Sequence, residues 1–297
     1  MATPITHRRI IKGLIDFGYK NVSKKGSCHG LAMMSIQAFL ISREALSTFR
    51  DRLDDIVDHP HISKDIQPIL AKKPDQLTQN EIKLKETYFN IWAFFDGVRL
   101  HHSPEMFRKI FGKSLSQGHF SEIAKATHPV ATPSIKKIGG SIGLYTLDEM
   151  TNYITALRES LEKTKLEKSK LKMSFLLGSP HHVIQISYDA NAEQWILFDS
   201  NQEGFFDSRK TTVHNDRSVA KWIIQHCYGL SAKYMSEIEN IKEQSNKLFP
   251  ISLDAICAAE NENVLTETFY NVTQSTFYQT IHHSLTDKIE YEKNKKQ

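Results

Sequence analysis

The hydrophobic period of the chain switches from helical to strand-like near residue 173, and this switch limits the folds that are open to the chain. From Cys28 to about residue 165 the apolar residues recur at helical spacing, with capping signals such as Thr78 followed by Glu81. Short β-rich segments bounded by turn residues come next, at residues 173–177, 183–188 and 195–198. Helices followed by consecutive short strands predict an α+β fold, with helices packed on a small antiparallel sheet.

The order of these segments also predicts the domain organisation. The apolar run from Cys28 to about residue 49 is typical of one buried helix. No linker divides the chain, so we expect a single domain over residues 1–285 with a large helical insert at about 51–165. The mostly charged residues 286–297 are expected to form a frayed tail.

Composition excludes several classes of protein. The net charge of +4 over 297 residues is too small and too evenly spread to predict a nucleic-acid partner. No apolar run approaches the roughly 20 residues that span a bilayer, and the first residues lack the apolar region of a Sec signal peptide. Three cysteines cannot form a disulfide framework and fit a reducing compartment. Each cysteine is therefore expected to be a core residue or a reactive thiol.

Cys28 is the cysteine whose surroundings favour reactivity. It lies in the run GSCHGL at the predicted start of a helix, where free N–H groups and the helix dipole stabilise a thiolate. The flanking Gly26 and Gly30 would let the backbone pass close to a substrate, and the Cys28 N–H would point at a forming oxyanion. The alternative is a small buried residue at a helix start.

Two further segments supply a candidate base and a carboxylate. His181 and His182 open a strand in which His182, Ile184 and Ile186 alternate onto one face. If the isoleucine face packs on the Cys28 helix, His182 is directed at the thiol and His181 is the alternative base. Asp199 ends the next strand and can accept the Nδ1–H of a histidine; the alternative is a turn-forming aspartate.

The order of cysteine, histidine and aspartate on a helix and two strands is the papain-like order. The segments GSCHGLA, HHVIQISYD and WILFDSNQEG resemble those of YopT-type papain-like cysteine peptidases. They are also similar to cysteine-protease-like domains of bacterial type IV (Dot/Icm-type) secreted effectors. The resemblance implies Cys28 as nucleophile, His182 as base and Asp199 as orienting residue of a thiol hydrolase. It further implies a protein made in the bacterial cytoplasm that is secreted and acts on a host protein.

The chain departs from the pattern of these families at several positions. Val183 stands where an alanine is usual, and Ser200 stands where a proline is usual. No glutamine precedes Cys28 to complete an oxyanion hole, so Asn21 is the upstream candidate. The same triad also serves transglutaminases and deamidases. A catalytically silent scaffold that binds a host protein through its helical insert is a further alternative.

No cofactor and no metal is predicted. The sequence has neither a phosphate loop nor a dinucleotide fingerprint. Its paired histidines, among them His101 and His102, lack ligands at zinc-binding spacing. Cys227 and Cys257 lie in apolar patterns of helical type, which predicts core packing. The oligomeric state is not predicted.

Overall fold

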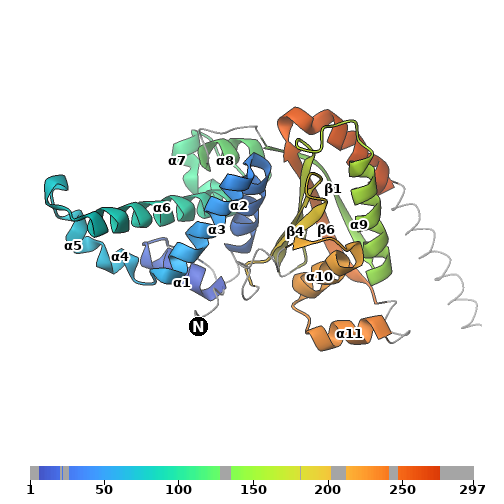
Figure 1. Ribbon diagram of the computed structural model, residues 1–297, viewed down its shortest axis with the longest axis horizontal. Coiled ribbons are helices and arrows are strands. Elements are labelled where there is room, and N and C mark those ends of the chain that lie inside the picture. Colours follow the sequence, from blue (N-terminus) through green and yellow to red (C-terminus); the bar gives the residue numbers. More distant parts are fainter. Residues whose placement is uncertain are drawn as a thin grey trace, which may run out of the picture.

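A computed structural model describes residues 7–20, 22, 27–127, 135–180, 182–201, 212–240 and 247–274. One antiparallel sheet stands between two groups of helices (Figure 1). The α+β prediction is therefore confirmed. Asn21, His181 and the tail at 286–297 lie outside the described residues. In the part of the chain that the structure describes, none of the helices combines the length and the apolar character needed to cross a bilayer.

Helices dominate the first half of the chain. The α-helices are α1 (His7–Asp16), α2 (Ser27–Ile41), α3 (Arg43–Asp58), α4 (Ile62–Asp65), α5 (Gln67–Leu70), α6 (Gln79–His102), α7 (Arg108–Phe111), α8 (Phe120–Thr127), α9 (Leu147–Glu162), α10 (Asp216–Tyr228) and α11 (Ala232–Asn240). Three short 3-10 helices are η1 (Pro74–Gln76), η2 (Pro104–Phe107) and η3 (Ala259–Asn261). A last helix runs over residues 262–274.

Over the described residues, the sheet has six strands in the order β1-β6-β2-β3-β4-β5, and every neighbouring pair is antiparallel. The strands are β1 (Ile135–Tyr145), β2 (Lys172–Gly178), β3 (Val183–Asp189), β4 (Gln194–Phe198), β5 (Thr212–Val213) and β6 (Phe249–Ala258). The three predicted strands are β2, β3 and β4, which pair with one another as consecutive hairpins.

Both faces of the sheet are buried, each under its own helices (Figure 1). The α2-side core joins α1, α2, α3, α6 and α8 to one face, and it includes Leu31, Ile36, Phe49, Phe94 and Phe95. The α9-side core joins α9, α10 and the helix at 262–274 to the other face, and it includes Ile154, Leu157, Ile184, Ile186 and Trp195. The reactive candidates lie where α2 meets the sheet.

The predicted helical insert at 51–165 is wrong over residues 135–145, which form the edge strand β1. This segment contains Gly139, Gly140 and Gly143, and glycine is a weak strand former. Its strand conformation comes from pairing with β6, which lies far along the chain. At Gly139 an added Cβ would lie 2.6 Å from the Phe269 ring, so the glycine admits the helix at 262–274. Tertiary contacts thus override the local pattern.

Two further boundaries differ from the predictions. The helix expected from Cys28 to about 49 is broken at Ser42, whose side chain accepts the Ala45 N–H at 3.0 Å and caps α3. Cys257 lies in β6 rather than in a helix, because Leu253, Ala255 and Cys257 alternate into the α9-side core. The prediction that Cys257 is a core residue is confirmed, since it is fully buried.

Candidate active site

Helix α2 carries Cys28 in its first turn and is fixed from two sides. On the sheet side, Ser35 Oγ donates a buried hydrogen bond of 3.0 Å to Gln185 Oε1 of β3. On the other side, a Cβ added at Gly30 would lie only 2.2 Å from the Val98 carbonyl oxygen of α6. Gly30 is therefore needed for the close packing of two helices rather than for the approach of a substrate. Gly26 lies outside the described residues.

His182 lies in the turn between β2 and β3, just before the strand begins. The turn is closed by the Ser179 N–H, which donates to the His182 carbonyl at 2.9 Å, and by the His182 N–H, which donates to Ser179 Oγ at 3.2 Å. The side chain of His182 hydrogen bonds with the Cys28 thiol. The structure therefore brings together the cysteine and the histidine that the sequence singled out.

The face of β3 assigned to α2 was wrong. Ile184 and Ile186 point into the α9-side core, whereas Gln185 contacts α2 and Val183 packs against the α2-side core. Because the sheet is covered on both sides, isoleucines alone do not identify the face that α2 occupies. His182 reaches Cys28 because it precedes the strand, where alternation no longer applies.

Asp199 follows β4 and is almost fully buried, with 3% of its side chain exposed. Oδ1 accepts from His182 Nε2 at 2.6 Å and from the Asn201 N–H at 2.8 Å. The expected bond from Nδ1 of the histidine is thus wrong: Nε2 faces the carboxylate. An ionised carboxylate only accepts, so Nε2 carries a proton and Nδ1 is the nitrogen left for the thiol. Asn201 closes this turn through its N–H, and its Nδ2 lies 3.4 Å from both ring nitrogens of His182.

A second histidine, which the sequence did not identify, completes the surroundings of Asp199. His226 Nδ1 donates to Asp199 Oδ2 at 2.7 Å. Its ring is stacked on Trp222, one turn earlier in α10, with ring centroids 4.4 Å apart. No motif surrounds these two residues. The one signal in the sequence is the i, i+4 spacing of two rings in a helix, which is common in packed helices.

The charges of the site stabilise one another. Burial alone would raise the pKa of Cys28, but the hydrogen bond and charge of His182 and the backbone of Val183 and His29 bring it below the ordinary value. Burial opposes the protonated form of His182, yet Asp199 and Cys28 raise its pKa to about 9. Burial would raise the pKa of Asp199, but the two histidines lower it to about 2. The interactions among the three groups therefore favour the thiolate form of Cys28, the imidazolium form of His182 and the carboxylate form of Asp199.

The other two cysteines have the opposite environment. Burial raises the pKa of Cys227 far above its ordinary value, and burial raises the pKa of Cys257 to about 12. Both are fully enclosed in the α9-side core. Cys28 is therefore the one cysteine of the three whose surroundings stabilise a thiolate.

His29, next to the thiol, turns toward the end of α6. Burial lowers its pKa to about 4, and the nearby His102 adds to this effect. Burial likewise lowers the pKa of His101 to about 3, and its Nε2 lies 3.1 Å from Gln37 Oε1. The rings of His29 and His101 are therefore neutral at pH 7. Over the described residues, no group of three or more histidine, cysteine, aspartate or glutamate side chains is arranged to hold a metal ion.

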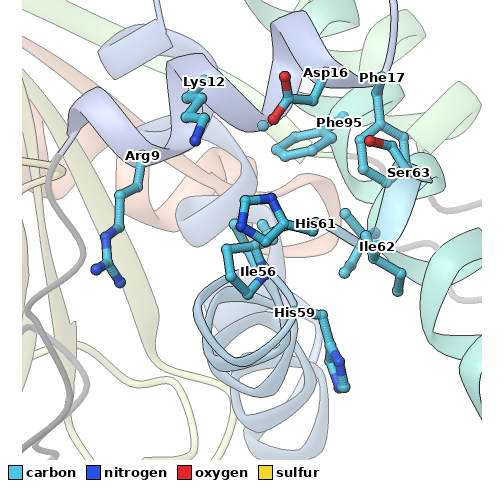
Figure 2. Close-up of a pocket in the computed structure, with 13 residues that line it drawn as sticks. Arg9, Lys12, Asp16, Phe17, Ile56, His59, His61, Ile62, Ser63 and Phe95 are labelled. Atoms are coloured by element: carbon cyan, nitrogen blue, oxygen red, sulfur yellow. The ribbon is translucent and has the colours of Figure 1, made fainter. Parts of the chain in front are cut away.

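A cavity of about 220 Å³ lies away from these residues, within the helical part. Figure 2 shows Lys12 of α1 and His61 reaching toward the same space, with Phe95 behind them, whereas Arg9 extends away. None of Cys28, His182 and Asp199 lines this cavity. It is separate from the candidate active site.

Comparisons with known proteins give no family for this chain. Neither the protein-family models, nor the curated proteins, nor the solved structures contain a match. The geometry of the site and the motifs of the sequence are therefore the basis for a proposed function.

Proposed function

We propose that this protein is a thiol hydrolase of the papain-like type. Among thiol hydrolases, a cysteine peptidase is the kind that its site supports best. The observation that carries the proposal is the chain of contacts from Cys28 through His182 to Asp199, in which the pKa of the thiol is lowered and that of the imidazole is raised to about 9. A thiolate paired with an imidazolium is the resting state that such chemistry requires.

In the first half of the reaction, Cys28 Sγ attacks the carbonyl carbon of an amide, and the carbon–sulfur bond forms as the carbonyl oxygen becomes an oxyanion. The N–H of Cys28 belongs to the nucleophilic residue itself and lies in the first turn of α2, so it is the candidate donor to this oxygen. His182 then gives its proton to the leaving nitrogen, the carbon–nitrogen bond breaks and a thioester remains.

In the second half, His182 takes a proton from water while the water oxygen attacks the thioester. The carbon–sulfur bond breaks, the acid product leaves, and the thiolate and imidazolium are restored. Asp199 holds the imidazole through Nε2 in both halves. If the attacked amide is the side chain of a glutamine, attack of water on the thioester gives deamidation. Attack of an amine in place of water gives transamidation.

The sequence resemblance to type IV secreted effectors supports a host-cell protein as the substrate. It also supports synthesis in a bacterial cytoplasm and action after secretion. Asn21 is the candidate for the second oxyanion donor, and His181 is the candidate for an alternative base. Both lie outside the described residues.

The proposal is tested by incubating the protein with a proteome-derived peptide library in the presence of a labelled primary amine. New peptide termini, amine-labelled glutamines and deamidated glutamines are counted by mass spectrometry, so one experiment separates the three reactions. Cys28→Ala is the matched control for the nucleophile, and Cys227→Ala is the control for a cysteine outside the site. We expect new termini that disappear only with Cys28→Ala. Products that persist in Cys28→Ala, or no product of any of the three kinds, would contradict the proposal.

A further inference from the structure

The last turn of α10 is hydrogen bonded both to Asp199 and to the turn that carries His182. His226 donates to Asp199 Oδ2 at 2.7 Å. The next residue, Cys227, accepts a hydrogen bond of 2.6 Å from Ser179 Oγ through its carbonyl oxygen. Ser179 in turn accepts the N–H of His182. Two consecutive residues of one helix thus reach the carboxylate and the backbone of the histidine.

The position of His226 is itself tightly held. Its side chain is 16% exposed, and its ring is stacked on Trp222 at an interplanar angle of 26°. The helix ends two residues later, at Tyr228, in a left-handed cap at Gly229, whose N–H returns to the carbonyls of Gln225 and His226. A donor held in this way fixes the direction of the carboxylate that accepts from it.

We propose that His226 is a positioning residue of the active site, which holds Asp199 Oδ2 so that Oδ1 is presented to His182. This inference rests on the proposed function, because it assigns a task in the same thiolate–imidazolium pair. Among the residues that the structure describes, three donors reach the two oxygens of Asp199, and His226 is the donor on Oδ2. Without the His226 donor, the buried Oδ2 of Asp199 loses its hydrogen bond. This loss is unfavourable, and it favours rotation of the carboxylate away from its position against His182.

Two substitutions separate the hydrogen bond from the packing of the ring. His226→Phe keeps an aromatic ring on Trp222 and removes the donor. His226→Asn loses the ring but keeps a donor, because Nδ2 of asparagine stands where Nδ1 of histidine does. His214, an exposed histidine that follows β5, provides a surface control as His214→Phe.

The experiment is the pH dependence of Cys28 alkylation by iodoacetamide in the full chain, read by peptide mass spectrometry, with thermal unfolding measured in parallel. We expect His226→Phe to slow alkylation near pH 6 by about tenfold, the factor that corresponds to a rise of about one unit in the pKa of the thiol. His226→Asn should recover most of the rate, and His214→Phe should match the unsubstituted protein.

The outcomes distinguish this inference from the proposed function. If Cys28 reacts well below its ordinary pKa and His226→Phe leaves the profile unchanged, the positioning role is refuted and the proposed function stands. Equal losses in His226→Phe and His226→Asn would show that a donor at this place does not restore the profile without the ring, which also refutes it. If Cys28 titrates near pH 8.5 in the unsubstituted protein, about the value of a free thiol, both proposals fail.

Discussion

Replacing Gly30 by alanine tests how α2 is held against α6, and two physical effects predict opposite results. Alanine is a better helix former than glycine and would stabilise α2 by at most about 1 kcal/mol. However, its Cβ would lie 2.2 Å from the Val98 carbonyl oxygen, which belongs to the backbone and cannot rotate away. The helices would have to separate by about 1 Å, and such overpacking costs about 1–3 kcal/mol or more. We therefore expect Gly30→Ala to lower the free energy of unfolding by about 2 kcal/mol.

The measurement is urea unfolding followed by circular dichroism, with Gly97→Ala as the matched control. Gly97 lies in the same helix interface, but an added Cβ there meets only the flexible end of Met34, at 2.8 Å. That control should be close to neutral. Because Cys28 is in the same turn as Gly30, the displaced helix should also slow alkylation of the thiol. A protein that becomes more stable with Gly30→Ala would refute the reasoning.

Three further results are expected. The pKa of Asp199 is about 2 in the folded protein against about 3.9 in an unfolded chain. The ionised carboxylate therefore stabilises the protein by about 2 kcal/mol above pH 4, and this stabilisation is lost as the pH falls toward 2. Melting temperatures from pH 5 to about pH 2 should show this loss, and Asp199→Asn should lack it. Ser35→Ala removes the donor to buried Gln185 Oε1 and should cost about 1–3 kcal/mol in urea unfolding; an unchanged midpoint would argue against that bond. Cys227 and Cys257 should be alkylated only after unfolding, and rapid labelling of either in native buffer would contradict their enclosed position.

Local patterns identified most of the elements around the site. The three central strands were evident because each is short, β-rich and closed by turn residues, and they pair as consecutive hairpins. The start of α6 was marked by the capping box of Thr78 and Glu81, which the structure contains. Cys28 at the start of α2 and Asp199 at the end of β4 follow from the same local signals.

What the sequence did not reveal depends on contacts between distant segments. Strand β1 was assigned to a helical insert, because its glycines give no strand signal and its partner β6 lies far along the chain. The face of β3 was misassigned because the face that meets α2 carries Gln185 and Ser187, which are polar and yet fully buried. His226 could not be identified, since only the packing of α10 beside β4 turns an ordinary helical histidine toward Asp199.

The proposed function requires that His182 stabilises the thiolate of Cys28, and the ultraviolet absorbance of the thiolate measures this directly. The absorbance of the Cys28→Ser variant, subtracted from that of the unsubstituted protein, isolates this one thiol during a titration from about pH 4 to pH 9. We expect a thiolate that forms below pH 8.5, about the pKa of a free thiol, and that forms only at a higher pH in His182→Ala. A thiolate that forms only near that value, or one that is the same in His182→Ala, would contradict it.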